Sequence, residues 1–581
     1  MKKLFALLLA SMLLLSGCGS TEGFQAGTFT GTGTGYSSEI EVEVTLTADK
    51  EIEEVKVLSE AETATIGSKA LPTYVEEVMA TGSLDIDTVS GATVSYNGFV
   101  AAMTAALESA GLTAADLKTK DSSTTVVEDV TLDTDVVIIG AGGAGMTAGT
   151  VAAENGAKVI ILEKAAFVGG NTTRATGGMN AAETVYQDEA GIEDSVELFV
   201  ADTMAGGYNL NNPELVQVMA ENSSDAIDWL ASIGAVFDNV GKAGGASVSR
   251  SHRPVDENGL KLPVGNIMVE KLEAATVEVG VETMTETTVN SIIMTDGVAT
   301  GVIATAADGH TVTVNAKAVI IASGGFGANN DLVATYSPEL KGYVTTNAPS
   351  ITGDGIVMGE AVGANLIDID QIQIHPTVRQ EDGALITESL RGDGSILINA
   401  EGNRFVDEMQ TRDVVSAEEN NQTGSFSWLI VDQEMYDESG VIQGYDAKGY
   451  WVKGETLEEL ATNIDVDATN LQAALDGWHT ALETGTDEFG RDVEGIELTL
   501  STAPYYAVKV SPGVHHTMGG LEINVNAEVI NTDGEVIPGL FAAGEVTGGI
   551  HGANRLGGNA LADISVFGHI AGENAAALAT K

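Results

Sequence analysis

The stretch VVIIGAGGAG, residues 136–145, decides how the larger part of this chain folds. Four consecutive branched apolar residues are typical of a buried parallel strand. The glycines after them let the backbone turn tightly and approach a pyrophosphate at a helix N-terminus. A second apolar run, residues 159–162, ends in Glu163 about 20 residues further on, where a carboxylate can accept a ribose hydroxyl. The order of strand, glycine turn, helix, strand and acid predicts a dinucleotide-binding α/β domain.

Two later stretches repeat the strand-to-glycine turn, VIIASGG at residues 319–325 and GLFAAGE at residues 539–545. Around them, apolar strands alternate with helical patterns from about residue 134 to the end of the sequence. The expected fold class is therefore α/β, with a Rossmann-like dinucleotide-binding domain.

The charge balance limits the possible partners. The 581 residues include 27 Lys and Arg against 84 Asp and Glu, a formal net charge of −57. This argues against nucleic acid as a partner, because phosphate binding requires clustered basic side chains. A charge of this size suits an extracytoplasmic, highly soluble protein.

Residues 1–18 are predicted to be a lipoprotein signal peptide rather than part of the fold. Lys2 and Lys3 precede an apolar run, residues 4–15, that is too short to span a bilayer by itself. The run leads into LSGC, residues 15–18, which resembles the lipobox of bacterial lipoproteins and implies lipidation of Cys18. The alternative is an ordinary signal peptide with an incidental cysteine. We expect the mature protein to be extracytoplasmic and lipid-anchored to the bacterial cell membrane.

Cys18 is also the only cysteine in the chain. Disulfides, cysteine-ligated iron–sulfur clusters and thioether-linked haem are therefore excluded. Any redox chemistry must use a cofactor that is held without thiols.

Residues 24–110 are predicted to form a small α+β domain. After a short tether rich in Gly, Ser and Thr, residues 40–46 alternate apolar and polar side chains, and residues 55–58 form a second strand pattern. Apolar residues then recur at helical spacing over residues 99–110. Residues 111–133, rich in Asp, Ser, Thr and Lys, are expected to be a linker.

From about residue 135 onward, the sequence resembles the flavoprotein part of soluble flavocytochrome c fumarate reductases and their ene-reductase relatives. The resemblance is carried by motifs in the family's order: GGN (169–171), GGMN (177–180), GGAS (244–247), HPT (375–377), TESLRG (387–392), RFVDE (404–408), TRD (411–413), GVHHTMGG (513–520) and HGANRLGGN (551–559). It implies non-covalent FAD and reduction of a carbon–carbon double bond next to a carboxylate. It also implies an FAD-binding domain formed by residues 134–369 and 516–581, with an α+β clamp (capping) domain of residues 370–515 inserted in it.

The N-terminal domain resembles the FMN-binding domain of sodium-pumping quinone reductases and of many extracytoplasmic reductases. Its attachment signature, Asp-x-x-Ser/Thr-Gly-Ala-Thr, is matched by DTVSGAT at residues 87–93. The resemblance implies that a separate flavin transferase joins FMN to Thr93 through a phosphoester bond. The alternative is a plain Ser/Thr-rich turn.

The resemblance also assigns the substrate contacts. Arg555 and His515 are implied to hold one carboxylate of a dicarboxylic acid, and His375 and Thr387 the other. Concentrated positive charge is needed to bind a dianion in so acidic a protein.

Proton delivery is implied for three further residues. Arg412 matches the arginine that gives a proton to the substrate carbon, and Glu388 and Arg391 match the pair that resupplies it. An arginine can act as the acid if the developing carbanion is far more basic and a carboxylate restores the proton. The alternative role for Arg412 is to clamp a carboxylate only.

Contacts to FAD are implied for a larger set, namely Gly140, Gly142, Gly143, Ala144, Gly145, Glu163, Lys164, Gly170, Asn171, Thr172, Gly177, Gly178, Gly325, Asp354, His516, Glu545, Arg555 and Leu561. A structural sodium ion is also implied, at the backbone oxygens of Thr517, Met518, Gly519, Glu545 and Thr547. No zinc site is expected at His515 and His516, because neighbouring residues of a strand face opposite sides. The other histidines are taken as structural or surface residues: His252, His310, His479, His551 and His569.

Fumarate is the favoured substrate, because the sequence keeps His375 and the Thr387–Glu388 pair, which urocanate-reducing relatives replace. Lys242, Ala243 and Leu385 stand near positions where fumarate reducers place methionines against the bound acid. The alternatives are another enoate of the urocanate, acrylate, cinnamate or itaconate type, a non-catalytic electron relay, or a dehydrogenase or oxidase running in the other direction. Electrons are expected from a membrane or extracellular donor.

Overall fold

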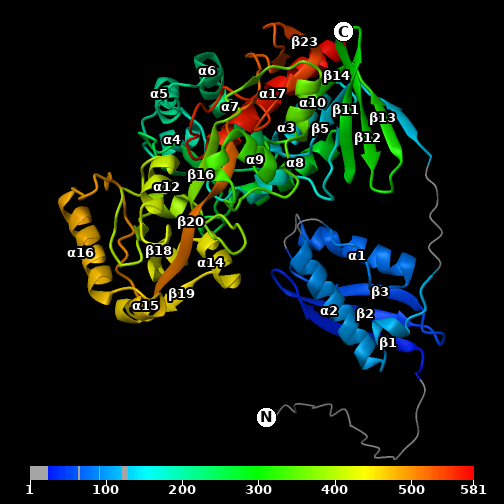
Figure 1. Ribbon diagram of the computed structural model, residues 1–581, viewed down its shortest axis with the longest axis horizontal. Helices are drawn as coiled ribbons and strands as arrows, with labels where there is room; N and C mark the ends of the chain where they lie inside the picture. Colours follow the sequence, from blue (N-terminus) through cyan, green and yellow to red (C-terminus); the bar gives the residue numbers. More distant parts are fainter. Residues whose placement is uncertain (1–23, 63–65, 90–91, 121–127) are drawn as a thin grey trace, which may run out of the picture. The chain divides into compact units, whose positions relative to one another are not determined.

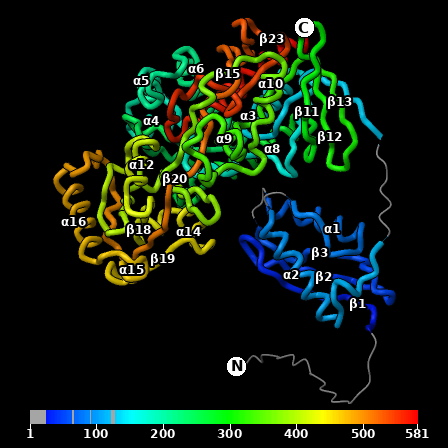
Figure 2. The backbone as a smooth tube through the Cα atoms, viewed as in Figure 1, coloured from blue at the N-terminus to red at the C-terminus, as the bar shows by residue number. Residues whose placement is uncertain are grey.

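The computed structural model describes residues 24–62, 66–89, 92–120 and 128–581, which divide into two compact units (Figures 1 and 2). One unit is built mainly from the residues up to 120 and the other from residues 128–581. The expected leader with Cys18, and Ser90 and Gly91 of the DTVSGAT stretch, lie outside the described residues. Of the helices that the described residues form, none is long and apolar enough to cross a membrane.

The first unit is an antiparallel sheet with two helices. Its strands pair in the order β1 (Gly27–Thr34), β2 (Glu39–Leu46) and β3 (Ile52–Ser59), and its helices are α1 (Gly67–Thr81) and α2 (Thr93–Ser109). Along β2 the apolar residues alternate into the core, as the sequence predicts for a half-buried strand. The small α+β fold expected for this region is therefore present.

Strand β1 occupies part of the stretch that the sequence suggests is a tether. A Cβ atom on Gly31 would lie 2.2 Å from the carbonyl oxygen of Ala102, and one on Gly33 would lie 2.1 Å from that of Gly98. The strand therefore needs glycines so that α2 can press against it. Glycine-rich strands give little pattern signal, which is why sequence reasoning missed this one.

Two boundaries also differ from the expectation. Helix α2 begins at Thr93, well before Phe99. The sequence did not predict this start, because the first turn of the helix is largely exposed and shows no apolar spacing. The last four residues of the expected linker form β4 (Val130–Asp133), which pairs in parallel with β13 (Thr311–Asn315). That strand is mostly exposed, so no apolar alternation marks it.

The second unit is built around a six-stranded sheet. Its first five strands run parallel and the last is antiparallel, in the order β10 (Glu282–Met284), β6 (Val159–Leu162), β5 (Val136–Ile139), β14 (Ala318–Ile321), β23 (Val536–Ala542) and β22 (Glu528–Ile530). Every side chain of β5, β6 and β14 is buried. The predicted Rossmann-like arrangement is confirmed, and all three strand-to-glycine turns leave neighbouring strands of this sheet.

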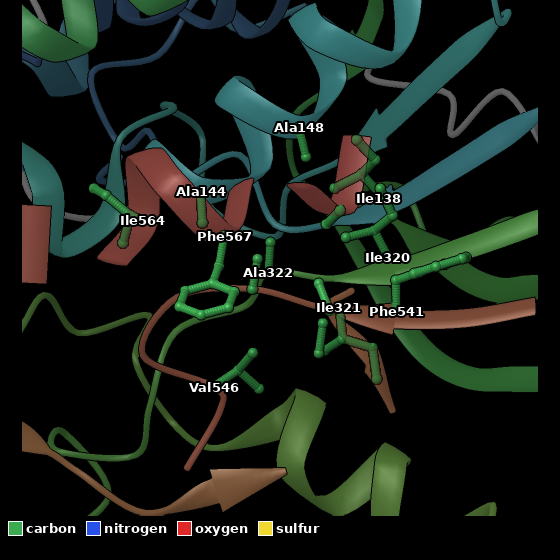
Figure 3. Packing of buried hydrophobic residues seen from close by; sticks show 14 of the residues in the cluster. Ile138, Ala144, Ala148, Ile320, Ile321, Ala322, Phe541, Val546, Ile564 and Phe567 are labelled. Carbon is green, nitrogen blue, oxygen red and sulfur yellow. The ribbon is translucent and has the colours of Figure 1, made fainter. Parts of the chain in front are cut away.

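Two helices pack together beside this sheet (Figure 3). Ala144 and Ala148 of α3 (Gly143–Glu154) lie close to α17 (Asn559–Ala579), whose Phe567 points toward Ala322 at the end of β14. A Cβ atom on Gly572 of α17 would lie 2.5 Å from the Ala148 carbonyl oxygen. The close contact of the two helices fixes the glycine turn in front of α3.

Three smaller sheets and seven helices, all within the described residues 128–581, also belong to this unit. A four-stranded sheet has the order β11 (Thr287–Thr295), β12 (Val298–Ala306), β13 and β4, and smaller sheets join β7 (Met179–Asn180), β9 (Ser251–Arg253) and β8 (Asn239–Gly241), and β15 (Leu366–Ile367) and β21 (Gly520–Leu521). The helices are α4 (Val185–Glu189), α5 (Val196–Gly206), α6 (Pro213–Glu221), α7 (Ser223–Ser232), α8 (Val264–Glu278), α9 (Asn330–Tyr336) and α10 (Asp354–Ala361).

A second hydrophobic core lies within residues 386–510. Its sheet has the order β16 (Ile372–Val378), β20 (Tyr505–Thr517), β18 (Ser427–Asp432) and β17 (Ile396–Ile398), with β19 (Val452–Gly454) also on β20. Its helices are α11 (Ser389–Gly392), α12 (Arg412–Asn420), α13 (Gln433–Asp437), α14 (Gly440–Ala447), α15 (Leu457–Asn463) and α16 (Ala468–Thr484). The first half of β20 pairs with β18 and β19, and its second half pairs with β16.

Candidate active site

One cavity, with an empty volume of about 1750 Å³ that includes the space at its mouth, runs from the glycine turn after β5 to α12 and β20. Sixteen of the eighteen residues expected to contact FAD line it. The two that do not are Gly145 and Gly325. A Cβ atom on Gly145 would lie 2.0 Å from the Gly140 carbonyl oxygen, and one on Gly325 would lie 1.9 Å from Thr517 Oγ1. These two glycines therefore allow close packing of the turn and loop behind the cavity, and Gly324 lines it in place of Gly325.

The glycine turn fits a dinucleotide. Helix α3 begins directly at the cavity, with Gly142 as its N-cap residue and Gly140 at φ 101°. A Cβ atom on Gly142 would meet nothing closer than 4.0 Å, so its face toward the cavity is open. Unpaired backbone N–H groups at a helix N-terminus favour a phosphate.

Polar groups at this end of the cavity are held in place by the backbone. The Glu163 carboxylate accepts the N–H groups of Ala141 and Ala165, both at 2.8 Å, which fixes it at the end of β6. Each oxygen keeps a lone pair for a further donor such as a ribose hydroxyl. Nearby, Lys164 Nζ lies 2.5 Å from Asp354 Oδ2.

The opposite end of the cavity contains the residues expected to bind substrate. His375 on β16 is fully buried, and its Nδ1 accepts the Thr377 backbone N–H at 3.2 Å. Burial, with the charges of Arg412, His515, Arg391 and Arg555, holds the pKa of His375 well below its usual range. The neutral ring must then carry its proton on Nε2, which has no hydrogen-bond partner among the described residues. This Nε2–H is a free donor for an anion.

His515 lies beside His375, with ring centroids 5.0 Å apart and planes at 62°. Its Nδ1 is 2.7 Å from the Thr346 hydroxyl. Burial and the nearby charges of Arg412 and Arg555 also keep the pKa of His515 well below its usual range. The two histidines therefore act as neutral, oriented hydrogen-bonding groups rather than as cations.

Arg412, the first residue of α12, is locked by two polar partners. Its Nε donates to Glu388 Oε2 at 2.7 Å, its Nη2 lies 2.5 Å from the same oxygen, and its Nη1 donates to Gln373 Oε1 at 2.9 Å. The other oxygen of Glu388 accepts the Gly244 N–H at 2.9 Å. Although burial opposes ionisation, the charges of Arg412 and Arg391 hold the pKa of Glu388 at about 2. Glu388 is therefore a carboxylate that touches the guanidinium of Arg412.

Arg391 continues this chain of charges. It is fully buried, and its Nη2 lies 3.9 Å from Glu388 Oε2, while its Nη1 donates to the Glu408 carbonyl at 2.6 Å. Its Nε and Nη2 have no hydrogen-bond partner within the described part of the chain. The expected sequence of Arg412, Glu388 and Arg391 is thus brought together in space.

Arg555 and Thr387 complete the cavity wall. Burial and the charge of Arg412 lower the pKa of Arg555 to about 9, although the charges of Glu388, Glu545 and Asp563 oppose this. Its Nη1 donates to the Leu556 carbonyl at 3.1 Å, and its Nε is unpaired among the described residues. The Thr387 hydroxyl lies 3.1 Å from Ser389 Oγ, and Tyr445 Oη accepts the Thr387 backbone N–H at 3.0 Å. The Arg555 guanidinium and the Thr387 hydroxyl therefore both line the cavity as possible donors.

Sequence reasoning missed the residues that position these groups. Gln373 fixes Arg412 and also donates to the Arg555 carbonyl at 2.7 Å, so it links the Arg412 guanidinium to the backbone of Arg555. Thr346 orients His515, and Tyr445 anchors the Thr387 backbone. Thr377 shares a strand face with His375, so the i, i+2 spacing could have found it. The others act only through tertiary contacts and leave no local signal.

His516 faces a different set of neighbours from His515. Its ring lies 5.3 Å from that of His551, and its Nδ1 lies 3.6 Å from Glu545 Oε1. The loops proposed to hold sodium are adjacent, since Leu521 bridges Thr547 and the Thr517 N–H donates to Glu545 Oε1 at 3.1 Å. Sodium binding there stays a prediction.

Comparisons with known proteins agree with this arrangement. A family model described as an FAD binding domain matches residues 135–561, and one described as an FMN-binding domain matches residues 35–108. The NADH:fumarate oxidoreductase of Klebsiella pneumoniae (strain 342) is 40% identical over 503 residues, which are 86% of this chain and 53% of that protein. The chain thus spans about half the length of that relative.

Another relative matches almost end to end. The urocanate reductase of Eggerthella lenta is 36% identical over 543 residues, covering 91% of this chain and 89% of that protein. Among solved structures, the open conformation of a flavocytochrome c3 fumarate reductase is 41% identical with a TM-score of 0.65, covering 78% of this chain and 79% of that one.

Proposed function

Since the chain belongs to the fumarate reductase-like family of FAD-dependent oxidoreductases that act on carbon–carbon double bonds, we propose that it reduces an α,β-unsaturated dicarboxylate, with fumarate giving succinate. The observation that carries this proposal is that His375, His515 and Arg555 line one cavity together with Arg412, which Glu388 and Gln373 lock in place. Bound FAD would supply the hydride to one alkene carbon. The side chains of this protein bind the acid, exclude water and deliver the proton.

In this proposal, a separate pair of hydrogen-bond donors binds each carboxylate of the substrate. Arg555 and His515 face one, and the Nε2–H of His375 with the Thr387 hydroxyl faces the other. A guanidinium suits a carboxylate because its planar fork can donate two parallel hydrogen bonds. These donors also stabilise the enolate-like charge that grows on the carboxylate during reduction.

The proton comes from the Arg412 guanidinium. A free arginine is a very weak acid, but the Glu388 carboxylate touches Nε and Nη2 of Arg412 and lies 3.9 Å from Arg391 Nη2. When Arg412 releases a proton to the substrate, Glu388 can take one from Arg391 and pass it to Arg412, and Arg391 then regains its proton from solvent. Gln373 and Glu388 together fix the direction of the guanidinium, which is the requirement for proton transfer to a carbon held at contact distance.

The substrate assignment is tested by comparing acids as oxidants of the reduced enzyme. Fumarate should exceed acrylate, cinnamate and urocanate by about tenfold or more in kcat/KM, because a monocarboxylate leaves one set of buried donors unpaired. Mesaconate and itaconate test the space beside Ala243 and Leu385, which both line the cavity. An aryl or imidazole enoate that outruns fumarate would favour the second candidate, a urocanate-type reductase, which the match to the Eggerthella protein supports.

Electrons are proposed to enter through FMN on Thr93. Thr93 is exposed in the first turn of α2, where helix N–H groups favour a phosphate and a flavin transferase can reach the hydroxyl. After expression with such a transferase, acid precipitation should release FAD and leave FMN on the protein. Thr93→Ala should abolish turnover with the physiological donor and spare turnover with small donors that reach FAD directly. Peptide mapping that finds Thr93 unmodified would remove this part of the proposal.

Anchoring through a lipidated Cys18 completes the proposal, with a membrane or extracellular donor as the electron source. Incorporation of a labelled fatty acid tests it, with Cys18→Ser as the matched control. The wild-type protein should be labelled and sediment with membranes, whereas the variant should be unlabelled.

A further inference from the structure

Arg391 is held at both of its ends by groups that the proton path does not use. Its Nη1 donates to the Glu408 main-chain carbonyl at 2.6 Å, and its own main-chain carbonyl accepts a hydrogen bond from Nη2 of Arg491. These contacts leave Nη2 of Arg391 as the nitrogen that faces Glu388, 3.9 Å away. Among the described residues this Nη2 has no hydrogen-bond partner, so it is free to donate.

Arg491 also closes the end of the short helix that carries the proton path. Helix α11 has Glu388 as its N-cap residue and contains Arg391 in its single turn. Carbonyl groups in the last turn of a helix lack partners inside the helix. Arg491 donates to the carbonyl of Arg391 and, through Nη1, to that of Ser395 at 2.9 Å. By fixing this turn, Arg491 fixes the spacing between Glu388 and Arg391.

The Glu408 carboxylate holds Arg491 in its turn. Glu408 Oε2 accepts Arg491 Nη1 at 2.9 Å and Arg404 Nη2 at 2.7 Å, and its Oε1 accepts Arg404 Nε at 2.9 Å. Although burial opposes ionisation, the charges of Arg491 and Arg404 hold the pKa of Glu408 below its usual value. Arg404 Nη1 donates further to Asp487 Oδ1 at 2.6 Å. All four side chains are buried, and their two positive charges match two negative ones.

Arg404 and Arg491 have similar surroundings apart from one partner. Both bind the Glu408 carboxylate, and both stack on Trp478, with guanidinium carbons 5.1 Å and 4.3 Å from the ring centroid. Only Arg491 reaches α11. The hydrogen bonds that Arg404 makes within the described part of the chain go to Glu408 and Asp487. The two arginines therefore separate the stability of the cluster from its contact with Arg391.

We propose that Arg491, held by Glu408, is a positioning residue for proton delivery, because it fixes α11 so that Nη2 of Arg391 is directed at Glu388. The proposal rests on the proposed proton path through Arg412, Glu388 and Arg391. Arg491 does not line the cavity and acts only through Arg391. It keeps its own protons throughout, so the proton balance of the path is unchanged.

The distance between Arg391 and Glu388 explains why this position matters. At 3.9 Å, Nη2 is beyond hydrogen-bonding distance and must move about 1 Å closer to Glu388 before a proton can pass. The main chain of Arg391 is the fixed end of that movement. If the main chain shifts, the guanidinium approaches Glu388 in the wrong direction, and a small misplacement of this kind slows proton transfer strongly.

The test is Arg491→Lys in the full-length, flavin-loaded protein. Lysine keeps the positive charge, so Glu408 is not left as an unpaired buried carboxylate. A single ammonium group cannot replace the planar fork that reaches Glu408, Ser395 and Arg391 together. At saturating fumarate, kcat should fall by about tenfold or more with KM nearly unchanged, because proton delivery acts in the transition state. The solvent deuterium isotope effect on kcat should rise, because proton transfer then limits the rate.

Arg404→Lys is the matched control, because it weakens the same Glu408 contact and the same stacking on Trp478 without touching α11. Its Tm should fall about as much as that of Arg491→Lys, while kcat and the isotope effect stay close to wild type. If Arg491→Lys does not fold, Arg491→Met combined with Glu408→Gln removes one charge of each sign and should show the same loss of kcat and the same rise in isotope effect.

The inference is overturned if a folded Arg491 variant keeps the wild-type kcat and isotope effect, or if Arg404→Lys loses kcat to the same extent, since the cluster would then act through stability alone. Failure of the proposed function would look different, because no unsaturated acid would then oxidise the reduced wild-type protein.

Discussion

Arg412 is the side chain on which the chemistry depends most directly, because its guanidinium is fixed by Glu388 and Gln373. Arg412→Ala should lower kcat at saturating fumarate by about a hundredfold or more, the range typical of a lost general acid, with only moderate loss of affinity. Steady-state kinetics combined with the FAD content measures this.

The control for Arg412 is Arg379→Ala, because Arg379 stacks over Tyr450 and does not line the cavity. Like Arg412→Ala, this substitution removes one positive charge. It should leave kcat nearly unchanged. Loss of affinity with intact turnover in Arg412→Ala would instead assign Arg412 the role of a carboxylate clamp.

The two site histidines lead to a prediction about pH. Both have pKa values well below 6.5, because burial and neighbouring guanidinium groups disfavour the cation. Neither therefore gains or loses a proton between pH 6 and pH 8, and Glu388, with a pKa of about 2, stays ionised throughout. The profile of kcat/KM, which reports the free enzyme, should be flat over this range. A limb near pH 6.5 that disappears in His375→Gln or His515→Gln would contradict this assignment.

Among the elements, the contact between β1 and α2 offers a sharp test of the FMN-binding unit. Gly31→Val would force a side chain into the backbone of α2, where the Ala102 oxygen would lie 2.2 Å from the new Cβ atom. Overpacking of this kind typically costs about 1–3 kcal/mol. We expect earlier thermal unfolding of this unit and less covalent FMN, with FAD content unchanged.

Gly27→Val is the matched control in the same strand, because its Cβ atom would meet only the Phe29 ring at 3.7 Å. It should be neutral, since valine favours strands. Equal effects of Gly31→Val and Gly27→Val on thermal unfolding would mean that α2 does not pack against β1 at Gly31.

The elements that could be predicted from the sequence are those whose pattern is local. The strand of residues 136–139, its glycine turn and the partner strand at 159–162 share one short unit, and all form as expected. β1 and β4 could not be predicted, because one is rich in glycine and the other is exposed, so neither shows apolar alternation. Helix α1 contains Pro72 within its span, which sequence reasoning treats as a helix breaker.

The same distinction applies to the site. His375, Thr387, Glu388, Arg412 and His515 could be named because each lies in a short motif that resembles a known family. The partners Gln373 and Thr346 could not, because they act on side chains that are 39 and 169 positions away in the chain.

For the whole molecule, the net charge of −57 opposes the approach of a dianion even though the cavity itself is rich in donors. Raising the ionic strength from about 0.01 M to about 0.15 M shortens the screening length from roughly 30 Å to 8 Å. We therefore expect kcat/KM for fumarate to rise with salt while kcat stays constant. A monocarboxylate should respond less. A fall in kcat/KM would show that the guanidinium groups lining the cavity control the encounter instead.

Strand β20 has a calorimetric consequence. Val508 and Val510 belong to the second hydrophobic core, whereas Val514, a few residues later on the same strand, belongs to the first. If either core unfolds, β20 loses hydrogen bonds that also hold the other core in place. Residues 128–581 should therefore unfold in one cooperative thermal transition, although they contain two cores. Among the residues that the structure describes, the FMN-binding unit shares no strand with them, and it should give a separate peak.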